Sequence, residues 1–335
     1  MNQSLLCTEQ PESHPLMDMA SIFQQSQTAI GRTAPNPPVA AGAFDVRGKL
    51  LGTAVHTGAG HSHAEAMLIQ QAEAGGWLSD IHSLYITLEP CNHHGRTPPC
   101  TQAIIRAGIK NVFYGIDDPN PVASGGGDFL RQHGVNVVSG VARAQAAASL
   151  LPFLHTIKTG KPFVVVKTAH RVDGNMVPLT GQKTFTAAED LLMAHRLRKS
   201  SDAIITGSGT VLADTPSFTV RHLPDYPGRV RHLVILDRRR RVPGEYIERQ
   251  KQLGFDVTVQ DDYARALEYL AQQGCLQVLV EAGPAITAHV ERTAGWQQWV
   301  RFYEEKPGAP VSVYADSAKG VTDLSSVDWR QGVAV

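Results

Sequence analysis

Three potential metal ligands constrain the fold of this chain most, because they lie far apart in the sequence and must meet at one ion. His63 opens the run His-Ala-Glu, and Cys91 and Cys100 follow further along the chain. One imidazole and two thiolates suit Zn²⁺, and three protein ligands leave the fourth tetrahedral position open for water. Glu65 stands two residues after the histidine, near enough to move a proton of that water without binding the metal. The pattern predicts a hydrolytic zinc site and not a structural one.

The expected secondary structure brings each ligand to the end of a helix or strand. Hydrophobic periodicity predicts a helix that starts near His63, a short strand over 84–88 just before Cys91, and a helix that starts at Cys100. The partial positive charge at a helix N-terminus favours the thiolate form of Cys100. A His-x-Glu run followed by Pro-Cys and a second cysteine is typical of zinc nucleobase deaminases. Eight residues separate the two cysteines here, where the common signature has two.

The composition argues against nucleic-acid and membrane partners. The 335 residues are 42% hydrophobic and 19% charged, as is ordinary for globular proteins, and the formal net charge is zero. The longest basic run is four arginines at 238–241, and such a run more often marks a solvated turn than a nucleic-acid surface. No apolar run reaches the length that spans a membrane. We therefore expect a small-molecule substrate, with neither nucleic acid nor membrane as a partner.

Cysteine usage and the N-terminal residues predict a cytoplasmic protein. Two of the four cysteines are assigned to zinc, which leaves Cys7 and Cys275 without a disulfide framework, as in a reducing compartment. Residues 1–16, which include Glu-Gln-Pro-Glu at 9–12, are expected to form a disordered leader. They lack the basic and apolar regions of a secretory signal.

Length and the alternation of strands with helices predict two α/β domains. Gly-Lys-Pro at 160–162 interrupts the pattern after an alanine-rich connecting helix, so we expect a first domain over 17–155 and a second over 156–335. The glycine triplet at 125–127 opens a predicted helix. Because it lacks the spacing of a phosphate-binding loop, we expect it to be a flexible loop.

Residues 87–100, Thr-Leu-Glu-Pro-Cys-Asn-His-His-Gly-Arg-Thr-Pro-Pro-Cys, closely resemble the deaminase half of bifunctional riboflavin-biosynthesis proteins of the RibD type. Residues 33–37 and 117–121 stand in the order and spacing of that family. The resemblance implies a cytidine-deaminase-like three-layer α/β/α domain that acts on a phosphoribosylaminopyrimidine. It implies Zn²⁺ on the three ligands named above, catalysis by Glu65, and substrate contacts from Asn36, His56, His94 and Arg96.

Apart from the resemblance, these four substrate candidates have simpler explanations. Asn36 lies between two prolines, where asparagine is a common turn residue, and His56 could lie on the surface of a strand. His94 and Arg96 could belong to a solvated loop, although the planar guanidinium of Arg96 suits a phosphate. Both interpretations stay open for each residue.

The second half resembles the reductase half of the same family, which is similar in fold to dihydrofolate reductase and uses NADPH. The resemblance implies a homo-oligomer and substrate or cofactor contacts from nine residues: Lys167, Asp173, Gly174, Arg198, Thr210, Asp214, Arg221, Glu281 and Gly283. Four strands are predicted in this half, at 163–167, 202–206, 232–237 and 277–281. Several of them end in glycine-containing loops, which is where α/β sheets bind nucleotide phosphates. No G-x-G-x-x-G motif is present.

Departures from the family leave two functions open. Arg171, Asn175, Thr215 and the run Gln-Lys-Thr-Phe at 182–185 stand where the family has other residues, which changes the hydrogen-bonding groups of a phosphosugar site. The first hypothesis is a zinc-dependent pyrimidine deaminase of riboflavin biosynthesis fused to an NADPH-dependent reductase. The second is a deaminase with an inactive reductase half, diverted to a flavin-like or pteridine-like metabolite.

Two further classes are less favoured. A non-catalytic, zinc-stabilised binding protein would not need the intact His-Ala-Glu run. A nucleic-acid-editing deaminase is disfavoured by the neutral charge and by the absence of interleaved aromatic and basic residues.

Overall fold

The chain forms two compact units, each built around its own β-sheet. The computed structural model describes residues 15–94, 98–177, 188–304 and 311–317. The first unit takes in the chain up to Ala29 and residues 38–149, and the second takes in residues 30–37 and the chain from Leu150 onward. The short segment 30–37 therefore groups with a unit whose other residues come much later in the sequence.

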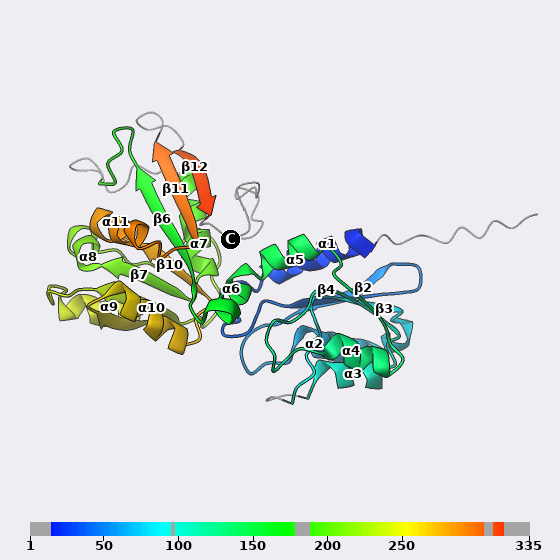
Figure 1. Ribbon diagram of the computed structural model, residues 1–335. Helices are drawn as coiled ribbons and strands as arrows, with labels where there is room; N and C mark the ends of the chain where they lie inside the picture. Colours follow the sequence, from blue (N-terminus) through cyan, green and yellow to red (C-terminus); the bar gives the residue numbers. More distant parts are fainter. Residues whose placement is uncertain (1–14, 95–97, 178–187, 305–310, 318–335) are drawn as a thin grey trace, which may run out of the picture. The chain divides into compact units, whose positions relative to one another are not determined.

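The first unit is a three-layer α/β/α sandwich (Figure 1). In chain order its elements are α1 (Pro15–Gln27), β1 (Ala40–Phe44), β2 (Leu50–Val55), α2 (Ala64–Gly75), the 3₁₀ helix η1 (Leu78–Asp80), β3 (Ser83–Leu88), α3 (Cys100–Arg106), β4 (Asn111–Ile116), α4 (Gly126–Gln132), β5 (Asn136–Ser139) and α5 (Arg143–Ser149). The strand order is β2-β1-β3-β4-β5, in which β1 runs antiparallel to both neighbours and β3, β4 and β5 are parallel. Helices α1 and α5 cover one face, and α2, α3 and α4 cover the other.

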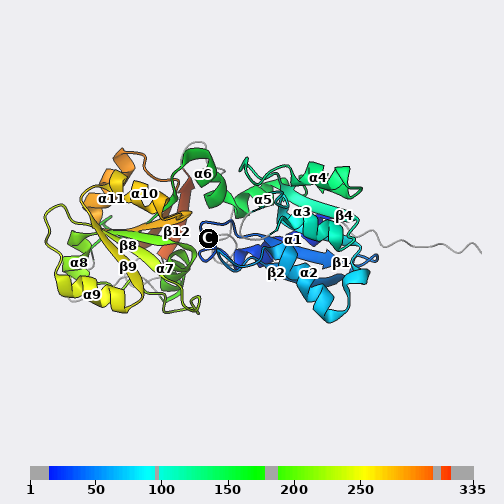
Figure 2. The same ribbon diagram turned by 90° about the horizontal axis from the view of Figure 1, so that it is seen from below.

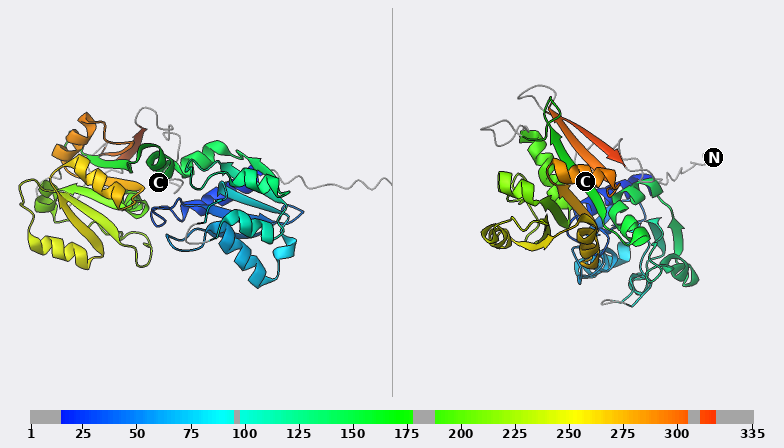
Figure 3. Two further views of the ribbon diagram at one scale, coloured as in Figure 1. Left: turned by 60° about the horizontal axis from the view of Figure 1, so that its bottom comes forward. Right: turned by 60° about the vertical axis from the view of Figure 1, so that its left-hand side comes forward.

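The second unit contains a seven-stranded sheet with helices on both faces (Figure 2). Its elements are α6 (Leu151–Thr159), β6 (Phe163–His170), α7 (Ala188–Ser200), β7 (Ala203–Gly207), α8 (Ser208–Asp214), β8 (Arg231–Leu236), α9 (Gly244–Gln252), β9 (Phe255–Gln260), α10 (Tyr263–Gln272), β10 (Gln277–Glu281), α11 (Pro284–Arg292), β11 (Gln298–Glu304) and β12 (Val311–Ser317). The order is β12-β11-β6-β10-β7-β8-β9, with only the β11–β12 pair antiparallel. Further views show the twist of both sheets (Figure 3).

The centre of the second sheet is built from short apolar runs, as expected of parallel strands buried on both faces. Val164, Val166, Val278 and Val280 are almost fully buried and pack against α10 and α11. Strands β6 and β10 are paired so that Lys167 lies opposite Glu281, the last residue of β10. The register of these two largely apolar strands thus places two charged residues side by side.

The mixed α/β architecture that we predicted from the sequence is confirmed. Strands β9, β11 and β12 were not among the expected elements. The expected connecting helix is two helices, α5 and α6, with Leu150 between them. The expected domain boundary at 155/156 falls inside α6. Within the described parts of the chain, no helix is both long and apolar enough to cross a membrane.

Candidate functional site

Three elements of the first unit bring His63, Cys91 and Cys100 together. His63 is the N-cap of α2, Cys91 follows β3, and Cys100 is the first residue of α3. The Nδ1 atom of His63 lies 3.4 Å from Cys91 Sγ and 3.5 Å from Cys100 Sγ. A nitrogen and a sulfur that share one tetrahedral zinc ion lie about 3.5 Å apart, given the usual zinc–ligand bond lengths. The three side chains therefore fit Zn²⁺ in both donor chemistry and spacing.

The local charges favour metal binding as well. Hydrogen bonding from Cys100, aided by the neighbouring His63, lowers the pKa of Cys91 to about 4, so that this sulfur is a thiolate at neutral pH. The main-chain amide of Cys100 also donates to Cys91 Sγ at 3.4 Å. All three ligand atoms lie within 4.8 Å of one another. The arrangement presents a cluster of soft donors to a cation.

Glu65 lies in the first turn of α2, buried beside this cluster. Burial raises its pKa to about 7, and the charge of Cys91 acts in the same direction. Its carboxyl group lies within hydrogen-bonding reach of the Cys100 side chain. A carboxyl group with a pKa near neutrality can both accept and return a proton, as a general acid–base catalyst must.

The loop that carries Cys91 is held by Glu89, a residue that our sequence analysis did not select. The Glu89 carboxylate accepts hydrogen bonds from the main-chain amides of Asp118 at 3.0 Å and Gly127 at 2.9 Å. A Cβ atom on Gly126 would lie 1.8 Å from the carbonyl oxygen of Pro90. The glycine triplet, which we expected to be a flexible loop, is therefore closely packed against the end of β3. No local signal in the sequence indicates this role, because both amides belong to residues far along the chain.

The proposed substrate residues of the first unit have different surroundings. His56 is buried, contacts the Ser62 carbonyl oxygen through Nδ1 at 3.1 Å, and lies edge-on to the His63 ring at 5.4 Å. His94 is exposed, and Arg96 lies outside the described residues. Asn36 belongs to the segment 30–37 of the second unit. The structure thus brings His56 to the zinc ligands, and the roles of all four residues stay predictions.

Two more polar groups of the first unit lie close to the cluster. Asp118 is buried, and burial raises its pKa to about 6, with Glu89 and Cys91 acting in the same direction. His93 has a buried Nδ1 atom without a hydrogen-bond partner, and its charge acts on Asp118. An aspartate and an unsatisfied imidazole next to the metal ligands are available to a polar substrate.

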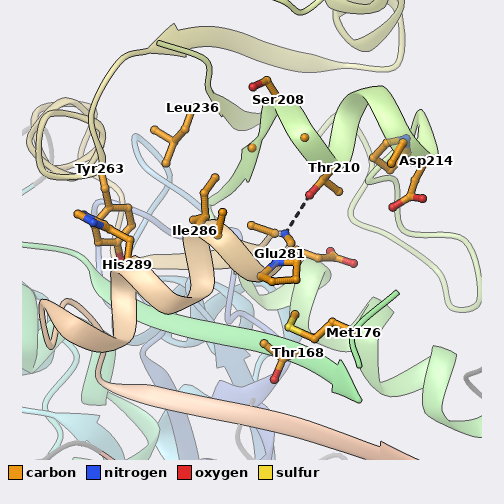
Figure 4. A pocket seen from close by; sticks show the side chains of 18 of the residues that line it. Thr168, Met176, Ser208, Thr210, Asp214, Leu236, Tyr263, Glu281, Ile286 and His289 are labelled. Atoms are coloured by element: carbon orange, nitrogen blue, oxygen red, sulfur yellow. Dashed lines mark hydrogen bonds between the residues drawn. The ribbon is translucent and has the colours of Figure 1, made fainter. Parts of the chain in front are cut away.

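The second unit has a pocket of about 700 Å³ at the carboxyl ends of its central strands (Figure 4). Parallel α/β sheets bind ligands at this edge. Five of the nine expected residues line it: Lys167, Thr210, Asp214, Glu281 and Gly283. The hydroxyl group of Thr210 accepts a hydrogen bond from the Gly283 amide at 2.9 Å, which joins α8 to the loop after β10.

Arg198 reaches the floor of this region from α7. Its Nε and Nη2 atoms donate to the two carboxylate oxygens of Glu281, at 2.8 and 2.7 Å. Burial opposes the charge on Glu281, but Arg198 outweighs it and, with Lys167, lowers the pKa of Glu281 to about 2. Burial also lowers the pKa of Lys167. Glu281 is therefore ion-paired with Arg198, and the charge of Lys167 acts on it in the same direction.

The other expected residues of this half lie further out. Asp173 and Gly174 form an exposed turn in which Arg171 pairs with Asp173 at 3.2 Å. Arg221 is exposed and donates to Thr219 Oγ1 at 3.2 Å. None of these residues lines the pocket, and their roles stay predictions.

The run 238–241 is exposed and includes a turn, as we expected, but two of its arginines also line the pocket. Arg238 and Arg241 both face it, and Arg241 Nη2 donates to Ser208 Oγ at 2.9 Å. These arginines reach the pocket because β8 ends at Leu236, so that the run begins at the ligand-binding edge of the sheet. A charge pattern read along the sequence does not contain that information.

Comparisons with known proteins agree with this geometry. The family described as cytidine and deoxycytidylate deaminase zinc-binding region matches residues 13–116, and the RibD C-terminal domain matches residues 162–303. The riboflavin biosynthesis protein RibD of Bacillus amyloliquefaciens is 36% identical over 85% of this chain and 82% of that protein. The protein of the same name from Aquifex aeolicus is 37% identical over 76% of both chains.

Solved structures extend the likeness to the fold of both units. A Thermotoga maritima protein, described as a diaminohydroxyphosphoribosylaminopyrimidine deaminase/5-amino-6-(5-phosphoribosylamino)uracil reductase, superposes with a TM-score of 0.79 at 30% identity over 89% of each chain. Acinetobacter baumannii RibD superposes with a TM-score of 0.76 at 28% identity over 92% of each chain. On this evidence, the chain belongs to the RibD family of riboflavin biosynthesis proteins.

Proposed function

We propose that this protein catalyses two successive reactions of riboflavin biosynthesis. The first unit deaminates diaminohydroxyphosphoribosylaminopyrimidine by hydrolysis, and the second uses NADPH to reduce 5-amino-6-(5-phosphoribosylamino)uracil. The observation that carries the proposal is the cluster of His63, Cys91 and Cys100 beside buried Glu65. The Thermotoga maritima relative, described by both activities, supports the choice of substrates.

The deaminase step needs a proton carrier next to an activated water molecule. Zinc held by the three ligands would supply a Lewis acid that lowers the pKa of that water to near neutrality. Glu65 accepts a proton from the water and delivers it to the ring nitrogen. It then carries the second proton, from the newly bound hydroxyl group, to the departing amine, which leaves as ammonia. Its pKa of about 7 suits both directions of transfer. The carbon that loses the amine gains the oxygen of water.

The reductase step has room and charge in the pocket of the second unit. NADPH would supply the hydride. The pocket extends from Lys167 on β6 to Arg238 after β8, which is three strand-to-strand steps, or about 14 Å at the usual strand spacing. That length suits an extended dinucleotide. Arg238 and Arg241 offer positive charge for its phosphates, and Lys167 and Glu281 offer polar groups at the opposite end.

The cellular compartment and the oligomeric state of the protein are also proposals. The described cysteines Cys91, Cys100 and Cys275 form no disulfide, which supports a reducing compartment and hence the cytoplasm. We propose a homo-oligomer that takes small-molecule substrates, by analogy with the family.

One assay tests both reactions. Purified, zinc-loaded protein is given the diaminopyrimidine substrate while ammonia release and NADPH oxidation are followed together. We expect both signals in the wild type and neither in Glu65→Ala, which still oxidises NADPH when the uracil intermediate is supplied. Ammonia without NADPH oxidation, even with that intermediate, would favour a diverted deaminase with an inactive second unit. No ammonia from the wild type would contradict the proposed deaminase.

A further inference from the structure

The wall of the second-unit pocket includes a backbone segment in an unusual conformation. Residues 215–221 follow α8, and Pro216 and Phe218 of this segment line the pocket. Thr215 has a φ of 44° and Phe218 a φ of 54°, in the left-handed region that residues with bulky side chains rarely adopt. Such conformations persist only where the surroundings hold them, and they occur often at functional sites. We call residues 215–221 the pocket-wall segment.

Helix α9 holds the first part of the pocket-wall segment. Tyr246 Oη and Gln250 Nε2 both donate to the carbonyl oxygen of Pro216, at 2.7 and 2.9 Å. Both side chains are buried. The main chain is therefore fixed just before Phe218.

Helix α7 holds the second part with two side chains one turn apart. Arg198 Nη1 donates to the Thr219 carbonyl oxygen at 3.1 Å, and the Arg221 amide donates to His195 Nδ1 at 3.0 Å. The His195 side chain is 2% exposed. One face of α7 thus binds a main-chain carbonyl group and a main-chain amide group of the pocket-wall segment, both after Phe218 in the sequence.

His195 can accept this hydrogen bond only as a neutral imidazole whose proton is on Nε2. The charged groups around His195 favour its neutral form, because three of them, Arg198, Arg221 and His222, repel a positive charge on the ring. Among the groups that act on it, Glu281 alone is acidic. Burial, followed by the charge of Arg198, lowers the pKa of His195 to about 4. The imidazole is therefore an acceptor throughout the neutral pH range.

We infer that His195 is a positioning residue of the reductase, which fixes the main chain of Arg221 and so presents a preformed pocket-wall segment to the phosphoribosyl-bearing substrate. The inference rests on the proposed reductase function. Arg198 takes part on both sides, since it binds the pocket residue Glu281 and the Thr219 carbonyl. Arg198 therefore contacts both the pocket residue Glu281 and the pocket-wall segment. His195 binds the same segment two residues further along, at Arg221.

Two substitutions separate the hydrogen bond from the bulk of the ring. In His195→Asn the side-chain oxygen can take the place of Nδ1, and in His195→Leu no acceptor remains. The control is His222→Leu, which removes the exposed imidazole that packs edge-on against His195 at 4.5 Å but leaves the hydrogen bond intact. Deamination by the first unit of the same molecules reports the amount of zinc-loaded enzyme, and NADPH binding reports whether the second unit of each variant is folded.

We expect His195→Leu to raise the KM for the uracil substrate about 10-fold, as for the loss of one hydrogen bond that orders a binding wall. His195→Asn and His222→Leu should stay within about 3-fold of the wild type. The dissociation constant for NADPH and the rate of ammonia release should not change. Amide hydrogen exchange gives a second readout, in which Arg221 loses protection in His195→Leu and keeps it in His195→Asn.

The outcomes distinguish the inference from the function on which it rests. If the wild type does not oxidise NADPH with the uracil substrate, the proposed reductase fails and the inference fails with it. If the wild type is active and His195→Leu matches it, the inference alone is overturned. Equal losses in His195→Leu and His195→Asn, or a parallel loss of NADPH affinity, would also overturn it, because they would mean that the ring acts through general packing.

Discussion

Arg198 and Glu281 face each other with two parallel hydrogen bonds, Nε to Oε2 at 2.8 Å and Nη2 to Oε1 at 2.7 Å. Their side chains are 11% and 16% exposed. A bidentate pair this deeply buried is stabilising only while both charges are present, and removing one partner leaves the other unpaired. The pair lies directly under the second-unit pocket, so that its state affects both folding and ligand binding.

The stability of the second unit should depend on pH through Glu281. Its pKa in the folded protein, about 2, is below the ordinary value of 4.5. Its contribution, about 3 kcal/mol by linkage, is therefore fully present above pH 4.5 and is lost as the pH falls toward 2. We expect Glu281→Gln to lower the free energy of unfolding by about 3 kcal/mol at pH 7. That difference should shrink between pH 5 and pH 3 in denaturant titrations, about as the linkage relation requires.

The matched control for this prediction is an exposed ion pair. Glu248 lies 2.7 Å from Lys251 on the surface of α9. Glu248→Gln should change the free energy of unfolding by less than about 0.5 kcal/mol. A pH-independent effect of Glu281→Gln would contradict the linkage argument.

Zinc affinity should depend on Glu89, although it is not a ligand. Glu89→Gln replaces one acceptor oxygen by an amide that cannot accept from Asp118 or Gly127, so the loop that carries Cys91 loses one of its two restraints. We expect the zinc dissociation constant, measured by competition with a chelator, to rise about 10-fold to 100-fold. Glu73→Gln, at an exposed position of α2, removes the same charge and should leave zinc affinity unchanged.

The deaminase should also be sensitive to a single methyl group at Gly126. A Cβ atom there would lie 1.8 Å from the Pro90 carbonyl oxygen, so Gly126→Ala must displace the main chain next to Cys91. We expect ammonia release to fall at least about 10-fold, as a ligand loop shifts, while the reductase keeps its activity on the uracil substrate. Gly244→Ala, where no atom lies within 4 Å of the added Cβ, should affect neither reaction.

Cofactor preference should depend on two of the four consecutive arginines. Replacing Arg238 and Arg241 by glutamine removes the cations of the run that line the pocket. We expect the KM for NADPH to rise about 10-fold to 100-fold, with little change for NADH, because the 2′-phosphate loses its charged partners. Arg239→Gln removes a charge from the same run outside the pocket lining and is the control. An equal effect on both cofactors would mean that these arginines do not recognise the 2′-phosphate.

The sequence was sufficient to predict the three zinc ligands, but not the residue that holds the loop of Cys91 in place. Donor types and spacing were sufficient to expect His63, Cys91 and Cys100 at one ion, because few other arrangements use that set. The role of Glu89 depends on main-chain amides 29 and 38 residues away, on the chain that follows β4, the strand paired with β3. Residue types alone do not specify that pairing.

The second unit was harder to predict for the same reason. Its local apolar runs predicted four strands, but their order depends on non-local pairing, and β9, β11 and β12, which complete the sheet, were not expected. The pocket position of Arg238 and Arg241 was not foreseen, because the run was interpreted without knowledge of the strand end that precedes it. The anchors His195 and Tyr246 left no local signal, because each binds main-chain atoms of a distant loop.

The segment 30–37 bears on how this protein can be divided. The Tyr226 hydroxyl donates to the Ile30 carbonyl oxygen at 2.8 Å, and a Cβ on Gly31 would meet the carbonyl oxygen of Lys199, so the segment is an integral part of the second unit. Its flanking residues belong to the first unit. The two units are therefore interleaved along the polypeptide, and any single cut leaves at least one of them in two pieces. Gene fission at one site, or a protease acting once, cannot release both enzymes intact.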